Sequence, residues 1–261
     1  MQLLFVEGSR PTRDAFREFT EAFESVSISF DPLQSPPLQL VSADGVDITQ
    51  RSAASAIEDN TVWLELLRYG LTFDILGLAP GDATKPLEVV HRFDLDQSPV
   101  NLRYEAVQIE PGEHLSGGEN SMPVARGMIA LARDLTQHFD NLAAVYWPHA
   151  KTALGRRYFE SIATAWLEGG AFPALGLTAF RETIDGALQS VGLEFWIGQE
   201  LRIEQPLATD KVLATRLGVR IINQLILLGG LEGSERIVAP DGTRLVMRPS
   251  RNGKYIRVTH E

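Results

Sequence analysis

The sequence predicts an α+β fold, with small mixed or antiparallel sheets and helices packed on one side of them. Apolar residues make up 44% of the 261 residues and charged residues 22%, which is typical of a globular protein with a core. Runs with the two-residue period of strands occur from one end of the chain to the other, with helical spacing between them. Asp-Gly and Asn-Gly pairs between short apolar runs indicate tight hairpins. The length fits one compact unit over residues 1–261, or two related lobes over 1–100 and 101–261.

The first part of the chain is predicted to be mostly strands. Apolar alternation and turn residues predict strands at residues 2–6, 26–30, 38–41, 46–48, 71–75, 87–93 and 104–109. The strands 38–41 and 46–48 are expected to form a hairpin around Asp44-Gly45. Residues 62–69 fit a helix or a strand equally well. A helix is expected from Asp14 to Phe23, because its apolar residues share one helical face after a Thr12 cap.

The second part alternates helices and strands. Pro123 in the first turn predicts a helix to Phe139, and a second is predicted from Arg156 to Leu167, ending at Gly169-Gly170. Strands are predicted at 142–147, 193–197 and 200–204. A long helix follows from a Thr209-Asp210 cap to Leu228. Pairs Asp241-Gly242 and Asn252-Gly253 predict a three-stranded antiparallel meander at the end.

Composition and motifs exclude several classes of function. The absence of cysteine excludes disulfides, thiolate nucleophiles and cysteine-based metal sites. Gly117-Gly118 is not followed by Lys-Ser/Thr, so a phosphate-binding P-loop is rejected, and zinc-protease and serine-elbow motifs are missing. We therefore expect no cofactor and no metal. The Met1–Val6 segment is predicted to be a strand rather than a signal peptide, and no segment suits a membrane span, so a cytoplasmic location is expected.

Charge is unevenly distributed. The chain carries a net charge of -10, which disfavours nucleic acid as a partner. From Arg236 to Glu261, however, six basic residues stand against two acidic ones, a net charge of about +4. This segment fits either a basic hairpin paired with an acidic body or a site for an anion or a partner.

Aromatic and glycine landmarks in the C-terminal half carry a family resemblance. They are the helix Gly127–Ala132, the strand Ala143–Trp147, Phe159, and the run from Gly192 to Ile203. These segments resemble the uncharacterised bacterial family 4261 of domains of unknown function. The resemblance implies an architecture and no activity.

Two places could hold a site. One is the glycine-rich loop at residues 112–121, with Glu113, His114, Glu119 and Asn120 ahead of a helix N-terminus. The other is His149, which follows an aromatic strand, with Arg156 further along the chain. A surface loop and a packed aromatic core explain the same residues without a site.

Without a dense catalytic cluster, the sequence favours a non-enzymatic binding or assembly module that binds a protein partner or another copy of itself. The alternative is an enzyme, or a small-ligand or anion binder, that uses the loop 112–121 and His149.

Overall fold

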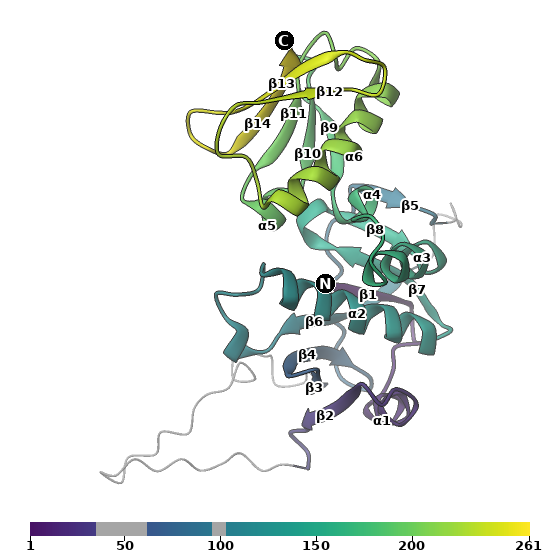
Figure 1. The fold of residues 1–261 in the computed structure, drawn as a ribbon. Coiled ribbons are helices and arrows are strands. Elements are labelled where there is room, and N and C mark those ends of the chain that lie inside the picture. Colours follow the sequence, from purple (N-terminus) through teal and green to yellow (C-terminus); the bar gives the residue numbers. More distant parts are fainter. Residues whose placement is uncertain (35–61, 96–102) are drawn as a thin grey trace. The chain divides into compact units, whose positions relative to one another are not determined.

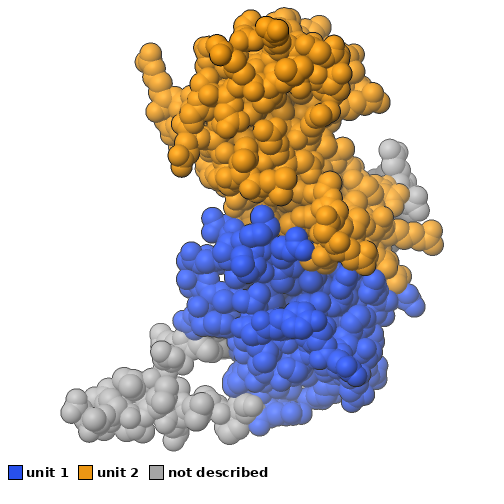
Figure 2. Space-filling view, in the orientation of Figure 1, with its two compact units in different colours: residues 1–87, 96–145 blue, residues 88–95, 146–261 orange. Residues whose placement is uncertain are grey.

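A computed structural model describes residues 1–34, 62–95 and 103–261, coloured along the chain in Figure 1. Their helices and sheets confirm the predicted α+β class. The chain divides into two compact units (Figure 2): unit 1 comprises residues 1–87 and 96–145, and unit 2 comprises residues 88–95 and 146–261. The hairpin predicted at Asp44-Gly45 lies outside the described residues. No helix in the described part of the chain is long and apolar enough to cross a membrane.

Unit 1 is built around six consecutive strands of an eight-stranded sheet, in the order β2-β3-β4-β6-β1-β7. Neighbouring strands from β2 to β1 pair antiparallel. Residues 62–69, ambiguous in the sequence, form mostly strand β3. The elements are β1 (Gln2–Val6), α1 (Arg13–Ala22), β2 (Val26–Phe30), β3 (Val62–Arg68), β4 (Leu71–Leu78), β6 (Tyr104–Pro111), η2 (Glu113–Leu115), α2 (Met122–His138) and β7 (Leu142–Trp147).

One face of this sheet forms the core of unit 1. Alternate residues of β4 and β6, such as Phe73 and Ile109, are fully buried, and α2 packs against both strands. From α1, Phe16 contacts Phe139, with ring centroids 5.4 Å apart. The helical spacing of apolar residues in α1 and α2 therefore serves to cover this face.

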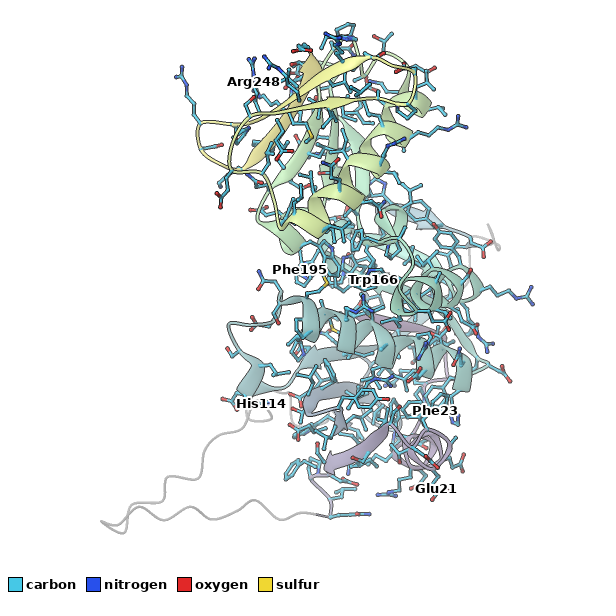
Figure 3. The ribbon with its side chains drawn as sticks, in the orientation of Figure 1. Glu21, Phe23, His114, Trp166, Phe195 and Arg248 are labelled. Carbon is cyan, nitrogen blue, oxygen red and sulfur yellow. The ribbon has the colours of Figure 1, made fainter. Side chains whose placement is uncertain are left out.

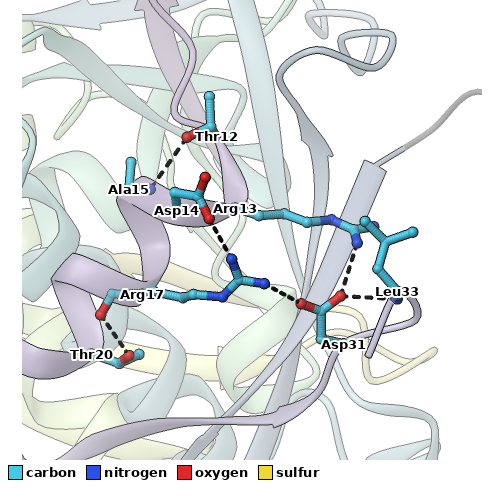
Figure 4. Close-up of polar contacts among 8 residues, drawn as sticks. All are labelled: Thr12, Arg13, Asp14, Ala15, Arg17, Thr20, Asp31 and Leu33. Atoms are coloured by element: carbon cyan, nitrogen blue, oxygen red, sulfur yellow. Dashed lines mark hydrogen bonds and ion pairs between the residues drawn. The ribbon is translucent and has the colours of Figure 1, made fainter. Parts of the chain in front are cut away.

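A buried carboxylate fixes the start of α1 to the end of β2 (Figure 4). Asp31 is 4% exposed and accepts hydrogen bonds from Arg13 at 2.8 Å and Arg17 at 2.9 Å. Its Oδ1 also accepts the Leu33 backbone N–H, at 3.1 Å. The Thr12 hydroxyl caps the helix by accepting the Ala15 N–H at 3.2 Å, as the sequence predicted.

A second buried ion pair joins β3 to α2. The guanidinium of Arg68 donates to Asp134, and both side chains are almost fully buried. Arg133 donates to the other carboxylate oxygen of Asp134, with its Nη2 at 2.7 Å, and is itself 20% exposed. The fold therefore encloses one arginine whose charge is compensated by one carboxylate.

Unit 2 contains a six-stranded sheet with the order β12-β13-β14-β11-β10-β9, and also the parallel pair of strands β5 and β8. Its elements are β5 (His91–Phe93), η3 (Pro148–Ala150), β8 (Thr152–Gly155), α3 (Arg156–Leu167), α4 (Ala174–Leu177), β9 (Ala179–Glu182), β10 (Leu188–Val191), α5 (Glu194–Ile197), β11 (Glu200–Ile203), α6 (Lys211–Leu228), β12 (Glu235–Val238), β13 (Arg244–Pro249) and β14 (Tyr255–His260).

Helix α6 covers one face of the six-stranded sheet and packs against β10 and β11. The carboxylate of Asp210 caps it, accepting the N–H groups of Val212 at 2.9 Å and Leu213 at 3.0 Å. A Cβ at Gly218 would lie 2.6 Å from the ring of Phe180, so glycine is what lets the helix approach the sheet this closely. The predicted cap and the predicted end near Leu228 are both confirmed.

The predicted C-terminal meander is also confirmed, because β12, β13 and β14 pair antiparallel in sequence order. Gly242 and Gly253 lie in its two turns with φ angles of 87° and 70°, the region that glycine adopts without strain.

Two strand predictions are wrong in part or in whole. Within the predicted strand 193–197, Glu194–Ile197 form the short helix α5 instead, since Gly192 and Gly198 have left-handed backbone angles on either side of this segment. Strand β5 covers only His91–Phe93 of the predicted 87–93. It pairs with β8 so closely that a Cβ at Gly155 would lie 1.9 Å from the Asp94 carbonyl oxygen.

Candidate anion-binding site

The loop 112–121 lies in unit 1, and its polar groups bond mainly within the loop. Glu119 is exposed, and its Oε1 accepts the Gly117 N–H at 3.0 Å. Hydrogen bonds from the backbone N–H of Glu119 itself and from that of Gly117 hold the pKa of this carboxyl below its usual value. His114 Nδ1 lies 3.2 Å from Thr72 Oγ1, and Glu113 and Asn120 are exposed. His114 is labelled in Figure 3.

An acidic row that the sequence did not reveal lies near this loop. Strand pairing sets Glu65 opposite Asp74, and Asp74 opposite Glu110. Burial, followed by the charges of Glu65, Glu110 and Glu113, raises the pKa of Asp74 to about 6. Within the described ranges, no group of three His, Asp or Glu side chains could hold a metal ion.

His149 lies in unit 2, within the short helix η3, against a group of aromatic rings. Its ring stacks on Phe195 with centroids 3.8 Å apart and lies 5.0 Å from the ring of Trp147. The residue as a whole is exposed, but desolvation of the ring against these aromatic groups lowers the pKa of His149 to about 4. We therefore expect an uncharged imidazole at neutral pH. Among the residues that the structure describes, the buried indole nitrogens of Trp147 and Trp196 have no hydrogen-bond partner.

The predicted site residues do not all belong to one body. Glu113, His114, Glu119 and Asn120 lie in unit 1, whereas His149 and Arg156 lie in unit 2, where Arg156 begins α3. Each subset therefore has to be considered by itself.

The face of the six-stranded sheet opposite α6 carries a row of arginines. Directly paired residues on neighbouring strands point to the same face, and five paired positions in turn are Arg181, Gln189, Arg202, Arg257 and Arg248. Like charges placed directly opposite each other repel, so such a row is destabilising unless anions compensate it.

Carboxylates compensate the middle of this row but not its C-terminal end. Arg202 pairs with Asp185 and, at 3.0 Å, with Glu204. Glu204 also lies 3.4 Å from Arg257 Nε, so one carboxylate serves two guanidinium groups. Arg248 and Arg251 form no ion pair with any carboxylate in the described part of the chain.

Arg248 and Arg251, together with Arg257, surround a hollow at the β13–β14 turn, which we call the arginine hollow. Its lining includes Arg248, Arg251, Arg257 and Tyr255, and no carboxylate, and its volume is about 690 Å³. Arg248 is labelled on β13 in Figure 3. Arg257 is 59% exposed, so its guanidinium can reach a ligand from solvent.

The turn that carries Arg251 is held by its own hydrogen bonds. The Ser250 N–H donates to the Tyr255 carbonyl at 2.7 Å, and the Ser250 hydroxyl donates to Asn252 Oδ1 at 2.7 Å. In return, the Tyr255 N–H donates to Ser250 Oγ at 3.0 Å. A turn constrained in this way limits the backbone ordering that ligand binding would otherwise require.

Charge counting along the sequence did indicate the C-terminal end of this site. It did not indicate Arg181 or Arg202, because only strand pairing aligns them with Arg257. Comparison with protein-family models, curated proteins and solved structures returned no match. The resemblance to family 4261 therefore stays a prediction.

Proposed function

We propose that the chain is a non-enzymatic binding module, and that its arginine hollow binds a phosphate-bearing anion. The observation that carries the proposal is the group of three guanidinium groups, from Arg248, Arg251 and Arg257, around one hollow without a carboxylate in its lining. Guanidinium groups bind phosphate oxygens through two parallel hydrogen bonds, which gives both charge and geometric complementarity.

The hollow favours a compact ligand over a nucleic-acid strand. Tyr255 is the one aromatic side chain in its lining, whereas single-strand binding surfaces offer several rings on which successive bases stack. The net charge of -10 also opposes long-range attraction of a polyanion. A small molecule or a protein segment with clustered phosphate groups would need only the local positive charge.

Binding at the arginine hollow fits the predicted role as a binding or assembly module in the cytoplasm of a bacterial cell, with a protein partner as one carrier of the anion. Enzymatic or anion-binding chemistry at the loop 112–121 and His149 stays the alternative. The two differ in where an anion would perturb the protein. If the arginine hollow binds the anion, we expect changes at the β13–β14 turn. If the alternative holds, we expect them at His114 or His149.

The proposal can be tested by titrating the full-length chain with tripolyphosphate. Binding is measured by isothermal calorimetry and by changes in amide chemical shifts. We expect saturable binding that weakens as salt is added, since the contacts are ionic. Replacing both Arg248 and Arg257 by Gln should weaken binding by at least about tenfold, the equivalent of ~1.4 kcal/mol.

A matched control removes two charges elsewhere in unit 2. Arg92 on β5 and Arg157 on α3 are exposed, and the double change to Gln alters net charge by the same amount. This control should change affinity less than about twofold, because neither arginine lines the hollow and salt screens exposed charges. Equal weakening in both variants, or no saturable binding, would overturn the proposal.

A further inference from the structure

A second concave site in unit 2 lies on the α6 side of the six-stranded sheet. This groove, which we call the α6 groove, runs between the first half of α6 and the β12–β13 turn, and its volume is about 430 Å³. That volume falls within the range of roughly 300–1,000 Å³ typical of small-molecule sites. It shares no lining residue with the arginine hollow.

The walls of the α6 groove are mainly apolar. Leu213 and Leu217 contribute from the helix, Leu207 from the segment before it, and Leu245 from β13. Leu213 is 60% exposed, an unusual position for a large aliphatic side chain next to a concave surface. An aliphatic ligand would remove this surface from water, which favours binding.

Two cations accompany the apolar walls. Arg216 and Arg220 are one helical turn apart on α6, so their side chains project from the same face of the helix and both line the groove. Neither forms an ion pair with a carboxylate that the structure describes. Asp241 is the one acidic residue in the lining, and its Oδ1 accepts the Thr243 N–H at 3.0 Å. The groove therefore keeps a net positive charge beside an apolar wall.

We infer that the α6 groove binds an aliphatic carboxylate, with the hydrocarbon chain along Leu213 and Leu217 and the carboxylate at Arg216 and Arg220. Apolar walls with a few polar groups at one end are the usual composition of sites that bind and orient small molecules. A guanidinium pair matches a carboxylate, since each can offer two N–H donors in a planar fork. The inference does not rest on the arginine hollow.

Decanoate, used below its micelle concentration, is the probe, with decanol as its uncharged analogue. In calorimetry with the full-length chain, decanoate should bind saturably and at least about tenfold more tightly than decanol. Amide shifts should change at Leu213, Leu217 and Thr243. Comparable affinities for the two probes would overturn the inference, as would the absence of saturable decanoate binding.

Two variants separate the head-group contacts from the walls. Arg216→Gln with Arg220→Gln should reduce decanoate affinity about tenfold and leave decanol affinity unchanged. Leu213→Trp, a change at an exposed helix position, should fill the groove and weaken both probes. The Arg92→Gln and Arg157→Gln control should affect neither. If the Arg216 and Arg220 variant binds decanoate as the unmodified chain does, the assignment of the head-group position fails.

Discussion

The buried ion pair between Arg68 and Asp134 makes a quantitative prediction about the stability of unit 1. Replacing Asp134 by Asn preserves side-chain size but removes the only carboxylate that hydrogen-bonds to Arg68 in the described structure. Arg68 is 6% exposed, so water cannot take the place of the lost partner. Arg133, at 20% exposed, can be solvated and should add little to the cost. Breaking a buried pair in this way costs about 3–5 kcal/mol of unfolding free energy.

The assay must read unit 1 alone, because a chain with two units need not unfold in one step. Hydrogen exchange of slowly exchanging amides in β3 and α2, with increasing urea, reports the local unfolding free energy. The exposed pair of Asp14 and Arg17 supplies a control, since Asp14 is 81% exposed. Asp14→Asn should cost less than about 1 kcal/mol.

A double variant tests the physical cause. Arg68→Met with Asp134→Leu removes both charges together, and paired apolar replacements of this kind are often neutral or stabilising. We expect it to recover most of the loss caused by Asp134→Asn. If Asp134→Asn costs less than about 1 kcal/mol, or if the double variant is as unstable as the single one, the reasoning from an enclosed, uncompensated arginine is refuted.

Three further predictions concern unit 2. Gly155→Ala should cost at least ~2 kcal/mol in urea unfolding, because its Cβ would overlap the paired strand, whereas Gly233→Ala, with open space around it, should be close to neutral. The pKa of His149, measured by NMR titration of its ring, should lie below 6.5. Folding disfavours the protonated ring, so the stability that the neutral ring contributes is fully present above pH 6.5 and is lost as the pH falls towards about 4. Unchanged titration at the ordinary value would contradict the packing of this ring. Asp210→Ala should lower the free energy of unfolding by ~1 kcal/mol, because it removes the cap of α6. Asp210→Asn should leave this free energy unchanged, because asparagine caps equally well. Equal losses in the two variants would show that the charge of Asp210 matters instead of the cap.

Local signals in the sequence were enough to predict much of the fold. Asp210 and Gly229 define the two ends of α6 through interactions that lie within a few residues. The pairs Asp241-Gly242 and Asn252-Gly253 likewise fix the meander, since a tight turn sets the register of the strands beside it.

Features that depend on long-range contact were not predictable in the same way. The run from Leu193 to Ile197 has enough bulky residues for a strand, but packing around Phe195 and Trp196 favours a helical turn. For the candidate site, charge counting indicated Arg248 and Arg257, while the alignment of Arg202 with them required strand pairing. In the first case, tertiary contact overrides a local pattern. In the second, strand pairing brings together residues that no local pattern relates.

The short strand β5 has a consequence for dissecting the protein. Residues 88–95 belong to unit 2 although unit 1 residues flank them on both sides of the sequence. A fragment that starts at Tyr146 would therefore lack the strand that pairs with β8 and would leave that edge open to aggregation. Isolating this half would require a designed linker that joins residues 88–95 to it.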